Sequence, residues 1–181
     1  MNVPNIISLG RLLLVPIMIW LVAVDEMAAS FWVFAAAALS DGVDGFIAKH
    51  FHQTSELGRF LDPLADKALL VSLFLMLGLQ GYLPSWLVIL VVSRDILIVG
   101  GFVFSVAVGL PFSLTPSFLS KTNTVGQLVL AGVVLAGVGL GWQIGLFEIA
   151  LIYGVAATTV WSGGSYLVGW AKTTGHAEDL R

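Results

Sequence analysis

The chain has no cysteine and few charged residues. Without cysteine it can form no disulfide, use no thiol nucleophile and offer no thiolate to a metal. Its three histidines are too few and too scattered for a zinc site, so any bound metal would need oxygen ligands. Only 10% of the 181 residues are charged, whereas 58% are hydrophobic and the mean hydropathy is +0.98. This composition excludes a water-soluble globule and indicates a bilayer as the medium.

Long apolar runs account for almost the whole chain. A membrane-spanning helix needs about 20 mostly apolar residues. Six such windows are separated by short polar breaks, and no linker or low-complexity tract divides them. The windows cover residues 7–24, 28–49, 60–79, 86–110, 124–142 and 146–171. We therefore predict one domain over residues 1–181, an all-α integral membrane bundle of six transmembrane helices.

The distribution of basic residues indicates how this bundle is oriented. The break at 50–59 is bounded by Lys49 and Arg59, the break at 111–121 ends at Lys121, and the C-terminal tail holds two more basic residues. The other three breaks carry no Lys or Arg. Cytoplasmic loops are enriched in these residues, so we expect both termini to face the cytoplasm.

The N-terminal sequence bears on the cellular location. Its first apolar run begins within a few residues of Met1 and contains Arg11, unlike the basic region and short apolar core of a cleavable signal peptide. We identify no transit peptide. The expected location is a bacterial inner membrane, with an active site that faces the cytoplasm, and the membrane of an organelle is the alternative for a mature form.

Four aspartates interrupt the second and third windows. Asp41 and Asp44 are three residues apart near the end of one window, and Asp62 and Asp66 are four apart at the start of the next. These spacings put each pair on one helical face, and the short break between the windows makes the two helices antiparallel neighbours. Four carboxylates in one cavity repel each other. We therefore expect a metal site of Mg²⁺ or Mn²⁺, with two ions about 4 Å apart.

Simpler interpretations of these residues exist. A single aspartate at a helix end often faces water or pairs with a nearby cation, here Lys49, Arg59 or Lys67. Gly45 and Ala48 are typical of close helix packing in membranes, although they also leave room for a ligand. A cation-coupled transporter would favour acids near the midplane and a repeat between its halves, whereas these acids gather at one membrane face and no repeat is found. A non-catalytic scaffold leaves the aspartates unexplained.

Together these residues form a longer motif, which resembles the signature of the CDP-alcohol phosphatidyltransferase family. That signature is Asp-x2-Asp-Gly-x2-Ala-Arg-x8-Gly-x3-Asp-x3-Asp, and every spacing agrees over 26 residues. One position departs from it, because Lys49 stands where the family has arginine, which keeps the charge but loses bidentate phosphate geometry. The motif here is Asp41-Gly-Val-Asp44-Gly45-Phe-Ile-Ala48-Lys49, eight residues, then Gly58-Arg-Phe-Leu-Asp62-Pro-Leu-Ala-Asp66.

The resemblance implies a metal-dependent transfer of a phosphatidyl group from CDP-diacylglycerol to an alcohol, with release of CMP. It implies that Asp41, Asp44 and Asp62 bind the metal ions. Asp66 is expected to act as the general base, which takes the proton of the acceptor hydroxyl, and also to contact the second metal. The nucleotide and its phosphates are expected beside Gly45, Ala48, Lys49 and Gly58.

Buried positive charge is the best guide to the acceptor alcohol, because an anionic acceptor needs it. Arg11, Arg94 and Lys121 are the candidates. Arg94 can instead form an internal ion pair with the adjacent Asp95 or another carboxylate. Lys121 can instead extend along the helix surface toward the membrane interface.

Two subfamilies compete at the positions around these cations. Ser-Arg-Asp at 93–95 and Ser-Lys-x-Asn-Thr at 120–124 resemble the CMP-forming cardiolipin synthases, whereas phosphatidylglycerophosphate synthases tend to show Arg-Glu and Gly-Lys-x-Lys-Thr. Glycerol-3-phosphate is nearly a dianion and benefits from a second lysine, but this chain has Asn123 there. We therefore expect phosphatidylglycerol as acceptor and cardiolipin as product, with glycerol-3-phosphate as the alternative.

Membrane lipids are the other expected partners, and no nucleic acid is expected. The small residues of the window at 124–142 suit close packing, either within the bundle or across a dimer. Proteins of this family look dimeric, so a homodimer is expected. The small residues are Gly126, Ala131, Gly132, Ala136, Gly137 and Gly139.

Overall fold

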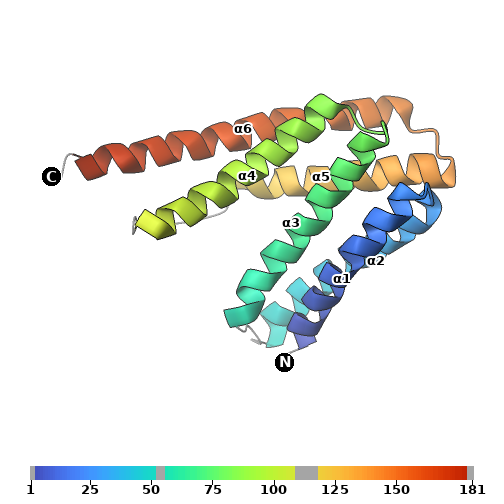
Figure 1. The fold of residues 1–181 in the computed structure, drawn as a ribbon, viewed down its shortest axis with the longest axis horizontal. Helices are drawn as coiled ribbons and strands as arrows, with labels where there is room; N and C mark the ends of the chain where they lie inside the picture. Colours follow the sequence, from blue (N-terminus) through green and yellow to red (C-terminus); the bar gives the residue numbers. More distant parts are fainter. Residues whose placement is uncertain (1–2, 52–55, 109–117, 179–181) are drawn as a thin grey trace.

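The chain is seen in a computed structural model that describes the backbone of residues 3–51, 56–108 and 118–178, and the side chains of 9–40, 67–101 and 119–166. All regular structure in these ranges is helical, which confirms the all-α class (Figure 1). The helices are α1 (Val3–Ala23), α2 (Met27–Phe51), α3 (Glu56–Leu79), α4 (Ser85–Val108), α5 (Phe118–Leu140) and α6 (Gly145–Glu178).

The helices extend beyond the apolar windows at their polar ends. α3 begins at Glu56 and α5 begins at Phe118, so parts of the predicted breaks at 50–59 and 111–121 are helical. Lys121 accordingly lies in the first turn of α5 instead of marking its start. The predicted starts of these two helices were wrong because hydropathy shows only where a helix meets hydrocarbon. Polar residues can continue the same helical backbone hydrogen bonds into water.

Three turns of the chain meet at one end of the molecule, which we call the turn end (residues 24–26, 80–84 and 141–144). Gln80 Nε2 donates a hydrogen bond of 3.0 Å to the Val22 carbonyl, and the Tyr82 hydroxyl donates one of 2.9 Å to Asp25 Oδ1. These bonds join the α1–α2 turn to the α3–α4 turn. α1 begins and α6 ends away from the turn end (Figure 1), so successive helices alternate in direction.

Each of these turns contains one residue in the left-handed region. The φ angles are 62° at Asp25, 81° at Gly81 and 72° at Gly141, a conformation that commonly ends a helix. Asp25 adopts it without being glycine, and its carboxylate accepts the Tyr82 hydrogen bond. That bond raises the pKa of Tyr82 above its usual value, so the phenol stays protonated and continues to donate at neutral pH.

The two helices that carry the aspartates are held by α1 and α5. α1 packs against α2 and α3, and α5 packs against α2, α3 and α6, while α4 packs against α3 and α6. Among the described residues the backbones of α2 and α3 do not approach each other closely, so the two helices meet only through their side chains. α3 and α4 leave their common turn at an angle, so they diverge away from the turn end (Figure 1).

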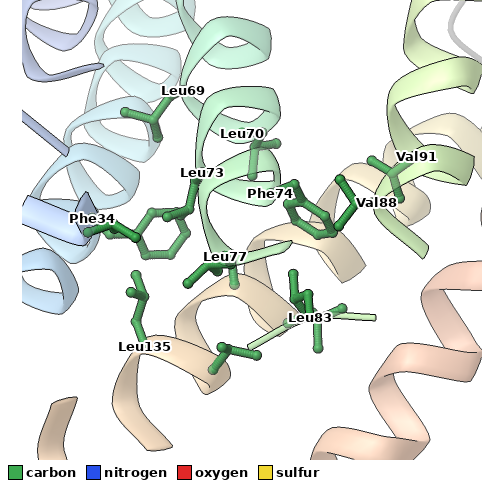
Figure 2. Close-up of a cluster of buried hydrophobic side chains, with 14 of the residues drawn as sticks. Phe34, Leu69, Leu70, Leu73, Phe74, Leu77, Leu83, Val88, Val91 and Leu135 are labelled. Atoms are coloured by element: carbon green, nitrogen blue, oxygen red, sulfur yellow. The ribbon is translucent and has the colours of Figure 1, made fainter. Parts of the chain in front are cut away.

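α3 supplies the centre of the apolar core. Its buried side chains recur at helical spacing, which gives one continuous apolar face. In Figure 2, Phe74 points toward Val88 and Val91 of α4, while Leu73 points toward Phe34 of α2. The buried side chains of α3 are Leu69, Leu70, Leu73, Phe74 and Leu77.

Large apolar side chains also cover the outside of the molecule. Leu39 on α2, Ile89 on α4 and Trp161 on α6 are 71%, 65% and 69% exposed. Soluble proteins rarely expose apolar surface so widely. Within the described part, Leu119–Leu140 and Gly145–Tyr166 are long and apolar enough to span a membrane, and three shorter apolar helices accompany them. These features fit a membrane protein, and the complete set of six spans stays a prediction.

Small residues of α5 serve packing inside the bundle. A Cβ on Gly139 would lie 2.5 Å from the Met27 carbonyl carbon, so only glycine allows α5 and the start of α2 to approach this closely. A Cβ on Gly132 would lie 3.4 Å from the Phe34 ring. Close packing within the bundle is thereby confirmed for these two glycines, and the homodimer stays a prediction.

Candidate active site

The four aspartates of the motif lie on two helices near one connection. Asp41 and Asp44 belong to the last part of α2, and Asp62 and Asp66 to the first part of α3. Their side chains lie outside the described residues, as do those of Gly45, Ala48, Lys49 and Gly58. In the described part of the chain, no three His, Asp or Glu side chains come together as a metal site. The four aspartates lie outside the part of the chain to which this finding applies, so the Mg²⁺ or Mn²⁺ site stays a prediction.

A small cavity lies between the helices that carry these aspartates. Its volume is about 60 Å³, and side chains from α1, α2, α3 and α5 surround it. Arg11, which is 3% exposed, reaches it from α1, and Thr124 from α5. α2 and α3 thus face a common space at this level, where their backbones do not approach each other closely. The residues that line it are Arg11, Ala37, Ala38, Leu69, Leu70, Thr124 and Leu128.

Arg94 is the centre of a buried polar cluster that joins four helices. Its Nη1 lies 2.7 Å from Asp95 Oδ1. Its Nη2 donates to two serine hydroxyls, Ser120 of α5 at 2.7 Å and Ser162 of α6 at 2.6 Å. From α3, Lys67 Nζ lies 2.6 Å from the same Asp95 oxygen. The internal ion pair considered for Arg94 is therefore present.

Arg94 keeps part of its donor capacity. It is 4% exposed, and its Nε has no hydrogen-bond partner. Its guanidinium carbon lies 6.0 Å from the centre of the Tyr166 ring, which adds a weak cation–π contact. A buried N–H without a partner is costly, so a ligand oxygen at this point would relieve that cost.

Asn123 links α5 to α6. It is fully buried, and its Oδ1 accepts hydrogen bonds from the hydroxyls of Thr158 at 2.8 Å and Thr159 at 2.9 Å. Its Nδ2 has no partner, and neither polar atom of Gln127, one turn further along α5, has one. The amide oxygen of Asn123 therefore serves helix packing, while its amide nitrogen keeps free donor capacity.

The four residues predicted to bind the acceptor do not form one group. Arg94 is buried beside Ser120, and Asn123 is buried beside Thr159. Both lie at the junction of α5 and α6. Arg11 lines the cavity between α1, α2, α3 and α5, and Lys121 is exposed.

Comparison with known proteins decides the family. The model of the CDP-alcohol phosphatidyltransferase family matches residues 1–161. The chain belongs to this family. The match covers both motif helices and the part of the Arg94 cluster on α3, α4 and α5, and it ends one residue before Ser162.

Relatives of this phosphatidyltransferase chain carry two activities in their names. It is 32% identical to the CMP-forming cardiolipin synthase of Rattus norvegicus over 91% of its own length and 60% of the relative's. It is 30% identical to the CMP-forming cardiolipin synthase of Streptomyces coelicolor, over 93% and 82% of the two chains. It is equally 30% identical to the CDP-diacylglycerol–glycerol-3-phosphate 3-phosphatidyltransferase of Escherichia coli, over 92% and 93%. The chain spans 60% of the length of the rat and human cardiolipin synthases.

Sequence reasoning missed several members of the polar cluster. Ser162 binds Arg94, and Thr158 and Thr159 bind Asn123, yet none of the three was singled out. Ser120, the other serine that binds Arg94, was named only as part of the pattern at 120–124. A signal existed, because Thr158, Thr159 and Ser162 recur at helical spacing in an otherwise apolar run. Polar side chains in such runs commonly bond between helices.

Proposed function

We propose that this protein transfers a phosphatidyl group from CDP-diacylglycerol to the hydroxyl of phosphatidylglycerol, giving cardiolipin and CMP. The family and the names of the relatives from Rattus norvegicus and Streptomyces coelicolor support the reaction type. The residues of the motif at 41–66 support the same chemistry.

The observation that carries this proposal is the cavity shared by α2 and α3. Ala37 and Ala38 line it from α2, and Asp41 follows them by four and three residues. Leu69 and Leu70 line it from α3, and Asp66 precedes them by three and four residues. Residues three and four apart share a helical face. Helical spacing therefore predicts that the aspartates continue the two faces that meet at the cavity.

Each aspartate has a proposed role in this reaction. Asp41, Asp44 and Asp62 would hold two Mg²⁺ or Mn²⁺ ions, which would neutralise charge on the pyrophosphate. Asp66 accepts the proton of the acceptor hydroxyl while the oxygen of that hydroxyl attacks the β-phosphorus of CDP-diacylglycerol. The bond between that phosphorus and the bridging oxygen breaks, and CMP leaves. The small residues Gly45, Ala48 and Gly58 would let the nucleotide approach the helix backbone, with Lys49 near its phosphates.

The choice of acceptor rests on the charge around Arg94. Asp95 offsets part of the charge of Arg94, and Asn123 is neutral where a second lysine would favour a dianion. A partly neutralised cation matches the single negative charge of phosphatidylglycerol better than the nearly double charge of glycerol-3-phosphate. Arg11 and the exposed Lys121 are the other cations proposed to attract the anionic acceptor.

Glycerol-3-phosphate is the second candidate acceptor, with phosphatidylglycerophosphate as product. It is favoured by the relative from Escherichia coli, whose length matches that of the chain almost completely.

We further propose that all six helices cross a bacterial inner membrane and that the turn end faces away from the cytoplasm. Trp20, Trp32, Trp86 and Trp142 lie close to the turn end and are exposed. Exposed tryptophans of this kind typically mark a membrane–water interface. The motif, at the opposite ends of α2 and α3, would then face the cytoplasm, where CDP-diacylglycerol presents its nucleotide.

Identification of the lipid product tests the proposal. The purified protein in phospholipid nanodiscs receives CDP-diacylglycerol, Mn²⁺ or Mg²⁺, and either phosphatidylglycerol or glycerol-3-phosphate, and the products are identified by mass spectrometry. Cardiolipin together with CMP is expected, and a chelator should stop both. Phosphatidylglycerophosphate as the sole product would establish the second candidate, and no CMP release with either acceptor would contradict the proposed function.

A further inference from the structure

Asp95 receives two cations on one oxygen atom. Its Oδ1 lies 2.6 Å from Lys67 Nζ and 2.7 Å from Arg94 Nη1. The side chains of Asp95 and Arg94 are 5% and 4% exposed, so their contact is poorly screened by water, whereas Lys67 is 30% exposed and its contact is partly screened. Lys67 and Arg94 would repel each other at this partly buried site without the carboxylate between them. Asp95 is therefore what allows the two cations to share this site.

The position of this contact along the helices is informative. α3 and α4 diverge from the turn end (Figure 1), and Lys67 and Asp95 are near the middle of their helices. The contact bridges the two helices where their backbones have already separated. Lys67 directly follows Asp66, the proposed general base. A shift of Lys67 would thus move the part of α3 that carries this base.

Arg94 extends the link to the other half of the bundle. Its two Nη2 bonds reach Ser120 of α5 and Ser162 of α6. With Nη1 on Asp95 and Nη2 on two serines, the plane of the guanidinium is fixed, and Nε is left with an unused donor. The orientation of that free donor is set by Asp95 on one side and by the serines on the other.

We propose that Asp95 is a positioning residue for the acceptor alcohol, an inference that rests on the proposed function. Asp95 holds Lys67 and Arg94 on one carboxylate oxygen. It thereby fixes the distance between α3, which carries the base, and the guanidinium of Arg94. The free Nε–H of that guanidinium binds the acceptor phosphate. The acceptor is then held with its hydroxyl within reach of Asp66. The nucleotide substrate, bound by the motif residues at 41–62, depends on this link much less.

The key variant is Asp95→Asn, which keeps the shape of the side chain and removes its charge. We expect the KM for the acceptor to rise about ten-fold or more, equivalent to about 1.4 kcal/mol, with the KM for CDP-diacylglycerol changed less than about two-fold. Asp95→Glu restores the charge and should recover part of the acceptor affinity. Ser162→Ala removes one of the bonds that orient Arg94, so it should raise the same KM by a smaller factor.

The matched control for the serine variant is Ser165→Ala. Ser165 is on the same helix, and its hydroxyl donates only to the Ser162 backbone carbonyl, at 2.7 Å. Both KM values should stay at wild-type levels in this control. Thermal midpoints in detergent show whether any variant has lost its fold.

Three outcomes would overturn the assignment of Asp95. The first is an acceptor KM that stays unchanged in Asp95→Asn. The second is an equal rise in the KM values for the acceptor and for CDP-diacylglycerol, with no recovery in Asp95→Glu, because that result is expected of a purely structural residue. The third is a wild-type protein that releases no CMP with either acceptor. That third result removes the proposed function as well, whereas the first two leave it intact and remove only the role of Asp95.

Discussion

At the scale of single residues, a sequence can place charges along helices but cannot show which distant groups they contact. The motif at 41–66 could be recognised because all its members lie within 26 residues. The pairing of Arg94 with Asp95 was also foreseeable, since the two are adjacent. The bonds from Arg94 to Ser120 and Ser162 were not, because 26 and 68 residues separate these partners. Such contacts depend on how the helices pack.

The role of Asp66 gives the sharpest prediction at this scale. Asp66→Asn keeps the size of the side chain but removes its ability to accept a proton. Since general bases contribute about 10²–10⁴-fold to a rate, kcat should fall by at least about 10². The rate of CMP release from CDP-diacylglycerol measures this.

Asp25→Asn provides the control for that variant. It makes the same chemical change at the turn end, before the start of α2, where Asp25 binds Tyr82, whereas the motif lies at the other end of α2. The control should retain its activity. An active Asp66→Asn variant would show that another group accepts the proton.

Asn123 permits a separate prediction on how α5 and α6 hold together. Asn123→Ala removes the acceptor of two threonine hydrogen bonds. Interhelical hydrogen bonds in membranes contribute about 0.6 kcal/mol on average and up to about 1.7, so the free energy of unfolding should fall by about 1 kcal/mol.

A double-mutant cycle with Thr159→Val isolates this bond. The effects of the two substitutions should be less than additive, because each removes the same contact. Additive losses in unfolding free energy, measured by denaturation in mixed micelles, would show that Asn123 and Thr159 are not energetically coupled.

At the scale of elements, the apolar windows predicted the number and order of the helices well. The starts of α3 and α5 were missed because Glu56 and the residues after Phe118 are polar or mixed, and hydropathy does not register a helix that continues outside hydrocarbon. The packing partners could not be predicted. Apolar helix faces in lipid resemble each other, and small residues such as Gly139 show only that some close approach occurs.

Gly139→Ala tests the close approach of α5 to α2. The new methyl group would meet the Met27 backbone at 2.5 Å, and backbone cannot move aside as a flexible side chain can. Overpacking of this kind costs about 1–3 kcal/mol, so the thermal midpoint in detergent should fall.

Gly154→Ala is the matched control, since no atom lies within 4 Å of a Cβ at that position in α6. It should leave the midpoint unchanged or raise it slightly, because alanine is the better helix former. Equal midpoints for the two variants would argue against the backbone contact between Gly139 and Met27.

At the scale of the whole molecule, the turn end and the motif end should lie on opposite sides of the membrane. The absence of cysteine makes this easy to test with single-cysteine variants. Gln143→Cys introduces a thiol at the exposed α5–α6 turn, and Ser55→Cys introduces one in the connection between α2 and α3. In intact bacterial cells, an impermeant maleimide should label the Gln143→Cys variant only. The Ser55→Cys variant should react after the membrane is opened, and the reverse pattern would invert the proposed topology.

The central claim of this account is that the aspartates of α2 and α3 bind divalent cations together. Electron paramagnetic resonance of Mn²⁺ bound to the purified protein, with CDP-diacylglycerol present, tests it most directly. We predict about two spin-coupled Mn²⁺ ions per chain, as expected for ions about 4 Å apart, and loss of the coupling in Asp62→Asn. Mn²⁺ that stays uncoupled, or that binds equally well after substitution of each of the four aspartates, would contradict the account.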